Sequence, residues 1–250
     1  MDVNAPLALL GGLSPAAFMR RHWQKRPLLV RQAWPGVAPP VTRREMFELA
    51  ASEDVESRLV VREPARWRVR QGPLPPRALP PLSRPGWTLL VQGLDLHRSA
   101  ARDMLERFRF VPDARLDDLM LSWASPGGGV GPHIDSYDVF LLQVQGQRRW
   151  SVGRVADASF VEGQPLKLLR RFEPQQQWLL EPGDLLYLPP RWGHDGVAEG
   201  GDCMTCSVGF RAPAAQELAR ELLQRLADDD GEQGALYRDP RQPATATPGA

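Results

Sequence analysis

Residues 131–154 read Gly131-Pro-His133-Ile-Asp135-Ser-Tyr137-Asp-Val139-Phe-Leu-Leu-Gln-Val144-Gln-Gly-Gln-Arg148-Arg-Trp-Ser-Val152-Gly-Arg, and this stretch decides the fold. It contains two short runs of strand-forming residues, 139–144 and 148–152. Similar runs lie on both sides of it, separated by Gly, Pro and Asp, at 119–123, 177–180, 185–188 and 204–210. Many short strands with this punctuation are typical of an all-β barrel or jelly roll. The chain is therefore predicted to be mainly β with flanking helices.

The flanking regions carry helix signals and a proline-rich break. Ser14 and Pro15 are the N-cap and first-position residues of a helix at 14–22, and leucines recur at helical spacing in 214–227. Further helices are expected at 42–51 and 98–108, strands at 57–62 and 87–91, and an extended segment at 27–30. The prolines of 73–85 predict a loop or lid. We expect an N-terminal α/β segment (1–95), a β-rich domain (96–212), a helical region (213–237) and a disordered tail (238–250).

Composition excludes several classes of protein. The 250 residues are 42% hydrophobic with a net charge of +1, so the chain can bury a sizeable core, and its overall charge favours neither nucleic acid nor a membrane surface. Its two cysteines, Cys203 and Cys206, face opposite sides of a predicted strand, so ordinary packing is favoured over half of a zinc knuckle or a redox pair. No signal peptide or membrane-spanning run is recognised, and a cytoplasmic location is expected.

His133, Asp135 and His194 form the ligand set of a mononuclear metal site. Residues i and i+2 of a strand point to the same side, so a strand end would present His133 and Asp135 to one ion. His194 follows a Pro-Gly turn, a short apolar strand and a Pro-Pro exit. Two imidazoles and one carboxylate leave adjacent positions open, which suits a non-haem Fe(II) oxygenase. A zinc hydrolase is disfavoured because no general base is in reach.

Alternation along the strands predicts a pocket beside this metal site. Asp118, Met120 and Ser122 share the mixed face of one strand, and Thr205 and Ser207 share a face of another. Arg148 shares a face with Trp150 and Val152, so it is expected to point inward and to bind a carboxylate of a 2-oxo acid. The alternatives are that the mixed faces meet solvent, or that Arg148 pairs with Asp184 or Glu181.

Several motifs together resemble one family. They are Arg21-His-Trp-Gln-Lys-Arg-Pro27, Asp117-Asp-Leu-Met120, Pro126-Gly-Gly-Gly-Val-Gly-Pro-His133-Ile-Asp135, Tyr137-Asp-Val-Phe140, Glu181-Pro-Gly-Asp184, Tyr187 and Ser207-Val-Gly-Phe-Arg-Ala-Pro213. The chain, over residues 14 to about 240, closely resembles the bacterial ribosomal oxygenases. These are cupin-like Jumonji C proteins that hydroxylate an arginine of the sixteenth protein of the large ribosomal subunit.

The resemblance implies a double-stranded β-helix (jelly roll) core at 96–212. It implies Fe(II) bound by His133, Asp135 and His194, and 2-oxoglutarate held by Arg148 with Ser122 and Thr205 nearby. With O2, such a site would hydroxylate the β-carbon of an arginine held by Asp118, Met120, Tyr137 and Ser207. Tyr137 is alternatively a packed aromatic at the rim. The expected partner is a ribosomal protein, and no direct nucleic-acid or membrane site is expected.

The sequence departs from the family pattern in two places. Thr205 stands where close relatives carry an asparagine near the cosubstrate. Relatives also continue from 213–237 into a longer helical dimerisation region and a winged-helix domain, so the family's homodimer is an open question here. The competing functions are a protein hydroxylase or demethylase acting on histidine or lysine, and a metal-binding cupin without turnover.

Overall fold

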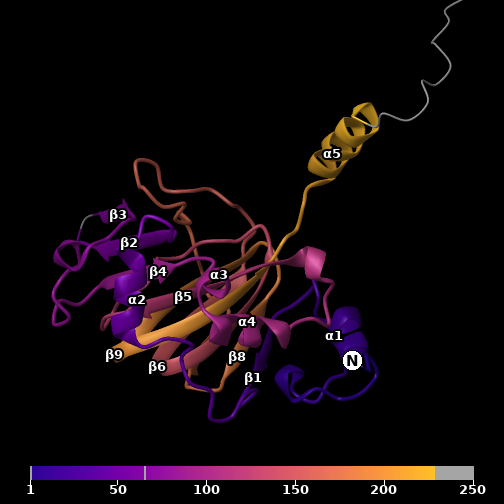
Figure 1. Cartoon of the computed structure of the whole chain (residues 1–250), viewed down its shortest axis with the longest axis horizontal. Helices are drawn as coiled ribbons and strands as arrows, with labels where there is room; N and C mark the ends of the chain where they lie inside the picture. Colours follow the sequence, from indigo (N-terminus) through magenta and orange to yellow (C-terminus); the bar gives the residue numbers. More distant parts are fainter. Residues whose placement is uncertain (1, 65, 229–250) are drawn as a thin grey trace, which may run out of the picture. The chain divides into compact units, whose positions relative to one another are not determined.

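The computed structural model describes residues 2–64 and 66–228. The chain divides into two compact units, Met1–Ala212 and Pro213–Ala250, and each is considered by itself. Within the described residues, the first unit contains one antiparallel nine-stranded sheet that curls into the jelly roll (Figure 1). Its strand order is β1-β8-β6-β9-β5-β4-β2-β3, with β7 paired to β6. The strands are β1 (Leu28–Val30), β2 (Ser57–Arg62), β3 (Trp67–Gln71), β4 (Trp87–Val91), β5 (Leu116–Ala124), β6 (Asp138–Arg154), β7 (Gln176–Leu180), β8 (Leu185–Leu188) and β9 (Trp192–Phe210).

The two longest strands of the roll, β6 and β9, lie side by side in the sheet. They pair antiparallel from Asp138 with Phe210 to Arg154 with Trp192. The two strands predicted at 139–144 and 148–152 are therefore one strand, interrupted only by register shifts between Gln143 and Gln147. Gly146 makes this bulge possible, because its φ is 64° and a Cβ there would lie 3.0 Å from the Asp202 carbonyl oxygen. The Gln-Gly-Gln signal marks a bend within a strand and not its end.

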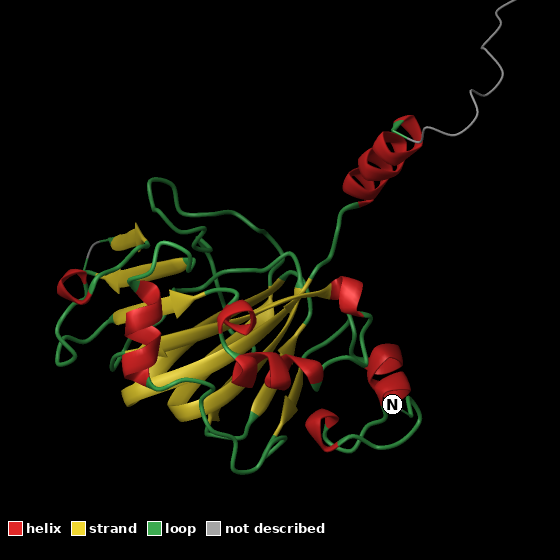
Figure 2. Cartoon of the chain, in the orientation of Figure 1, coloured by secondary structure: helices red, strands yellow, loops and turns green. Residues whose placement is uncertain are grey.

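Short helices lie around the sheet (Figure 2). The Ser14 side chain caps α1 by accepting a hydrogen bond from the Ala17 N–H, and Thr42 and Glu45 form a capping box on α2. Among the described residues, no helix is both long enough and apolar enough to cross a membrane. The helices are α1 (Pro15–Arg21), α2 (Arg43–Ala50), α3 (Leu94–His97), α4 (Ser99–Glu106) and α5 (Ala215–Ala227), with 3-10 turns η1 (Ala8–Leu10), η2 (Pro76–Ala78) and η3 (Asp113–Arg115).

One face of the sheet packs against helices of the first unit, among them α2 and α4. Buried side chains of α2 and α4, such as Met46 and Met104, join the main core with Leu119, Leu121 and Trp123 of β5. The alternate residues of β5 face the other way, towards the interior of the roll. The apolar face predicted for this strand is therefore its helix-covered face, and the mixed face is left for a site.

Phe140 lies at the centre of an aromatic cluster in this core. Its ring is fully buried and contacts the rings of Phe18, Phe108, Tyr187 and Phe210, with centroids 4.9–5.7 Å apart. Phe140→Ala should therefore lower the free energy of unfolding by about 3–5 kcal/mol, through lost burial and the cavity left behind. Urea unfolding followed by tryptophan fluorescence measures this. Phe160→Ala, at a partly exposed position, is the control and should cost much less.

The described part of the second unit is the segment 213–228, which contains α5. Leu218, Leu222, Leu223 and Leu226 of this helix are 56–66% exposed. The helix that the leucine spacing predicted at 214–227 is confirmed as α5. The predicted tail at 238–250 lies outside the described residues.

Candidate metal centre and cosubstrate pocket

His133, Asp135 and His194 come together inside the roll. Each offers one ligand atom, and the three atoms lie within 4.8 Å of one another. His194 belongs to β9, whereas His133 and Asp135 lie in the loop before β6, so the prediction that a strand carries this pair was wrong. An isolated bridge replaces the strand, because the His133 and His194 backbones exchange two N–H···O hydrogen bonds of 3.0 Å. This backbone bridge places the two imidazoles next to each other, with ring centroids 4.2 Å apart.

The backbone also sets the orientation of both rings. His133 Nδ1 lies 2.8 Å from the Gly131 carbonyl oxygen, and His194 Nδ1 lies 3.0 Å from that of Trp192. A carbonyl oxygen only accepts, so each Nδ1 carries the proton and each Nε2 keeps a free lone pair. The Nε2 atoms face Asp135, at 3.9 Å from His133 to Oδ1 and 3.5 Å from His194 to Oδ2. This donor set fits a divalent first-row metal with open coordination positions.

Burial and mutual attraction control the charges in this cluster. Burial, reinforced by the neighbouring His194, lowers the pKa of His133 to about 4. Burial opposes the charged forms of His194 and Asp135 as well, but their attraction outweighs it, so the pKa of His194 is raised and the pKa of Asp135 is lowered. The carboxylate is therefore held ionised, which is the form that binds a metal.

The three ligands open into a cavity of about 430 Å³. This volume suits a small organic acid together with one protein side chain. Of the other predicted site residues, Met120, Ser122, Tyr137, Arg148, Thr205 and Ser207 line it, and Asp118 does not. The pairing of β5 with β9 places Ser122 opposite Thr205 and Met120 opposite Ser207, so four of these residues form adjacent pairs on one wall.

Arg148 is buried in this cavity, 4% exposed, with its guanidinium 5.8 Å from the Trp150 ring centre. Its Nη2 is buried and has no hydrogen-bond partner in the described part of the chain, and its Nε reaches only the Cys203 sulfur at 3.5 Å. An unpaired guanidinium in a buried site is costly unless a ligand supplies an anion. The position therefore fits the distal carboxylate of 2-oxoglutarate.

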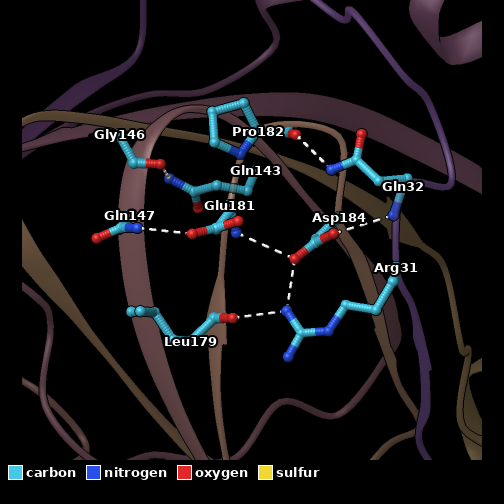
Figure 3. Close-up of polar contacts among 9 residues, drawn as sticks. All are labelled: Arg31, Gln32, Gln143, Gly146, Gln147, Leu179, Glu181, Pro182 and Asp184. Atoms are coloured by element: carbon cyan, nitrogen blue, oxygen red, sulfur yellow. Dashed lines mark hydrogen bonds and ion pairs between the residues drawn. The ribbon is translucent and has the colours of Figure 1, made fainter.

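Neither acid considered as an alternative partner of Arg148 is free to pair with it (Figure 3). Asp184 pairs with Arg31 at 2.5 Å and accepts from the Gln32 N–H, and Glu181 accepts from the Gln147 side chain at 2.8 Å. The adjacent Arg149 is exposed and pairs with Glu199. The structure therefore contradicts the protein-acid alternative.

Hydrogen bonds fix the polar groups on the wall near Arg148. The Ser122 hydroxyl donates to the Thr205 carbonyl oxygen at 3.3 Å, and the Thr205 hydroxyl donates to the Gln143 side chain at 2.8 Å. The proton of Thr205 is thus turned away from the cavity. Its hydroxyl oxygen can still accept a hydrogen bond, but the group cannot donate one to a bound acid without giving up Gln143.

Two of the predicted substrate residues, Tyr137 and Asp118, lie close together near Gly209, and Tyr137 lines the cavity. Tyr137 is 39% exposed, and Asp118 is half-buried at the end of β5 next to it. Asp118 Oδ2 accepts from the Gly93 N–H at 2.8 Å, and no salt bridge to it is found in the described residues. Burial, together with the charges of Asp117, Asp95 and Glu56, raises the pKa of Asp118. A cationic side chain would relieve this repulsion.

Some lining residues escaped the sequence reasoning. Arg58 on β2 lines the cavity with a buried, unpartnered Nε, and its alternation with the apolar Leu59 and Val61 was the available signal. Residues 165–168 also line the cavity, and nothing in their sequence marks them. The segment 73–85, which was expected to be a loop or lid, lines neither described cavity. Its Leu74 side chain is fully buried in the main core instead.

The two cysteines lie on opposite faces of β9, as predicted. Cys206 belongs to the main core and Cys203 to a small cluster beneath Arg148, and both are free thiols. Burial raises the pKa of the Cys206 thiol. These surroundings are those of packed side chains and not of a redox pair.

A family model described as JmjC domain matches residues 103–218, a range that holds all three candidate ligands and Arg148. The chain contains a JmjC domain over these residues. It is 40% identical over 92% of its length to the ribosomal protein uL16 3-hydroxylase of Escherichia coli K12, covering 61% of that protein. It is 39% identical over 82% of its length to a probable ribosomal oxygenase of Haemophilus influenzae, covering 52%. This JmjC chain thus spans about half to three fifths of these curated relatives.

Solved structures agree with this assignment. An Escherichia coli ribosomal oxygenase, YcfD, superposes with a TM-score of 0.81 at 39% identity, covering 93% of this chain and 62% of that one. The same protein in complex with cobalt and 2-oxoglutarate superposes with a TM-score of 0.79 at 38% identity, covering 95% and 62%. The cupin-like jelly-roll core of the JmjC chain is thereby confirmed.

Proposed function

We propose that this JmjC protein is an Fe(II)- and 2-oxoglutarate-dependent oxygenase that hydroxylates the β-carbon of an arginine in a large-subunit ribosomal protein. The observation that carries the proposal is one cavity that holds both a His-Asp-His cluster and a buried arginine without an anionic partner. The names of the relatives support a ribosomal protein as the substrate.

The chain's own part in the reaction is to bind and orient. When bound, Fe(II) and 2-oxoglutarate supply the oxidising power that uses O2 to convert a C–H bond to an alcohol, with succinate and CO2 as the other products. His133, Asp135 and His194 hold the metal, while Arg148 fixes the distal carboxylate. Ser122 and Thr205 line the cavity near Arg148, and each hydroxyl would donate to that carboxylate only by giving up its present acceptor, the Thr205 carbonyl oxygen or Gln143. The apolar side chains of the cavity exclude water from the reacting carbon.

The substrate side chain is proposed to enter past Tyr137. There Asp118 and Ser207 would receive the guanidinium, and Tyr137 and Met120 would flank it. The unpaired Asp118 carboxylate among other acids supports a cationic substrate residue over histidine. The aromatic ring of Tyr137 offers a flat surface to a planar cation.

The test is anaerobic loading with Fe(II) and 2-oxoglutarate, followed by air and a peptide from the arginine-bearing loop of the ribosomal protein. The expected product is a peptide heavier by one oxygen, about 16 Da, formed together with succinate. Peptides in which histidine or lysine replaces the arginine test the hydroxylase alternative, and a peptide with N-methyl-lysine at that position, read by loss of the methyl group as formaldehyde, tests the demethylase alternative. Binding of metal and 2-oxoglutarate without any turnover would favour the non-catalytic cupin.

Asp118→Asn should reduce peptide hydroxylation about 10- to 100-fold, because it removes a charge-assisted hydrogen bond contributing about 1.5–3 kcal/mol. The asparagine keeps the acceptor for the Gly93 N–H, so the fold is retained. Decay of 2-oxoglutarate without product should continue, so the ratio of succinate to hydroxylated peptide rises. Asp117→Asn is the matched control, since Asp117 pairs with Arg211 at the surface. Equal losses in both variants would contradict a role for Asp118.

The remaining proposals concern the domain bounds of the chain, its oligomeric state and its location. We infer a catalytic domain at 96–212 flanked by the α/β segment 1–95, and a helical region at 213–237 that takes part in a homodimer. The exposed leucines of α5 support the last inference. A cytoplasmic location is proposed because the substrate is ribosomal.

A further inference from the structure

The charge of the chain is concentrated in one segment. Residues 57–84, here called the basic edge, contain seven arginines, no lysine and a single acid, Glu63. The net charge of the whole chain is only +1, so the rest of the chain is net negative. The near-neutral net charge of the whole chain is therefore the sum of a strongly cationic segment and a net negative remainder.

The basic edge forms one border of the sheet. It comprises β2, β3 and the following loop, and β3 is the last strand in the sheet order, paired with β2 alone (Figure 1). All of its arginines except Arg58 are exposed. Arg68 and Arg70 share one face of β3, and at about 3.3 Å per residue their Cα atoms lie about 7 Å apart. This is close to the spacing of successive phosphates along an extended nucleic-acid strand.

The protein neutralises little of this charge itself. The Glu63 carboxylate forms ion pairs with three arginines, at 3.0 Å from Arg66, 2.9 Å from Arg68 and 3.9 Å from Arg84. No ion pair to Arg62, Arg70 or Arg77 is found among the residues that the structure describes. Arg62 lies over the Trp67 ring at 5.7 Å, and Arg70 and Arg77 have no acidic partner in the part of the chain that the structure describes.

The basic edge also borders the proposed active site. Arg58 of β2 lines the main cavity, and Arg62 and Trp67 line a second cavity of about 230 Å³. Leu168 lines both cavities and so lies between them. A macromolecule that lay along β3 would therefore lie next to the second cavity, which shares Leu168 with the main cavity.

We propose that the basic edge binds the phosphate backbone of RNA surrounding the target residue. A guanidinium group can donate two parallel hydrogen bonds to the oxygens of one phosphate. A cluster in which every cation is an arginine therefore suits bidentate phosphate binding and not only long-range electrostatic attraction. The choice of RNA rests on the proposed function, because a ribosomal protein in an assembled or assembling particle presents its loops among ribosomal RNA. The surface would favour such a particle over the free protein as substrate.

The test compares two double variants of equal charge change. Arg68→Gln/Arg70→Gln alters the basic edge, and Arg20→Gln/Arg21→Gln alters the exposed end of α1, far from β3 in Figure 1. Binding of a fluorescein-labelled ribosomal RNA fragment is measured by anisotropy over a range of salt concentrations. The basic-edge variant should bind about tenfold or more weakly, and its slope of log K against log salt should fall by about 2, about 1 for each phosphate that is no longer neutralised. The α1 variant should behave as the parent protein.

Hydroxylation of the free peptide separates this proposal from the proposed function. It should be unchanged in both variants, while modification of the protein within a ribosomal particle should slow only in the basic-edge variant. Equal loss of RNA binding in both variants, or none in Arg68→Gln/Arg70→Gln, overturns the RNA site. Equal binding of polyglutamate, abolished in the same variant, would reassign the surface to an acidic protein. Aggregation of that variant with RNA binding intact would show that the arginines only protect an edge strand.

Discussion

His194→Ala should abolish metal binding and lower hydroxylation by at least about 100-fold. Loss of groups that merely support metal ligands already costs about 10- to 100-fold, and His194 is proposed to bind the metal itself. Its ring is only 3% exposed and its Nε2 faces Asp135, so no nearby side chain can replace it. Anaerobic titration with Fe(II) or Co(II), followed by its absorption spectrum, measures binding directly, and succinate release measures turnover.

His97→Ala is the matched control for the loss of an imidazole. His97 lies on α3, outside the cavity, so its variant should bind metal and turn over as the parent does. Near-parental metal affinity in His194→Ala would show that the three-residue cluster is not the metal site. Circular dichroism of both variants separates loss of ligand from loss of fold.

Arg148→Met should weaken 2-oxoglutarate binding about 100-fold or more. A charge-assisted pair with a carboxylate contributes about 3 kcal/mol, which corresponds to about 100-fold in affinity. Methionine fills much of the same volume and removes a buried cation that has no protein anion, so the free energy of unfolding should stay equal or rise. The two effects have opposite signs, which a purely structural role for Arg148 would not produce.

Arg149→Met supplies the comparison, because Arg149 is exposed and pairs with Glu199 at the surface. Its variant should keep the parental affinity for 2-oxoglutarate, measured by calorimetry with Co(II) in place of iron. Unchanged affinity in Arg148→Met, or destabilisation of about 3 kcal/mol, would contradict the assignment of Arg148 to the cosubstrate.

Sequence patterns predicted much of the fold because each depends on local physics. Strands at 57–62 and 87–91 match β2 and β4, the capping residues Ser14 and Pro15 located α1, and the helix expected at 42–51 matches α2. Alternation correctly separated the buried Arg148 from the exposed Arg149. These patterns depend only on neighbours in the chain, so no knowledge of the tertiary structure was needed.

Where the predictions failed, interactions between residues distant in sequence had decided the structure. The bulge at Gly146 depends on the backbone of Asp202 and Cys203, which the sequence around Gly146 does not reveal. His133 is placed by pairing with His194, and not by a strand of its own. The segment 73–85 is a loop with one 3-10 turn, in agreement with the predicted loop, but it lines neither described cavity and its Leu74 side chain packs in the core. Arg58 was missed because its role depends on which strands neighbour β2.

The pairing of β6 with β9 has a consequence for how the protein folds. The residues that pair along these strands lie far apart in the sequence. Arg154 pairs with Trp192 at one end of the ladder, and Asp138 pairs with Phe210 at the other. Closing loops of this length precedes any gain from the pairing, so folding is expected to be slow and cooperative. His194, Thr205 and Ser207 all belong to β9 and reach the cavity only when this pairing is complete. The ability to bind metal is therefore acquired late in folding, and no early intermediate can possess it.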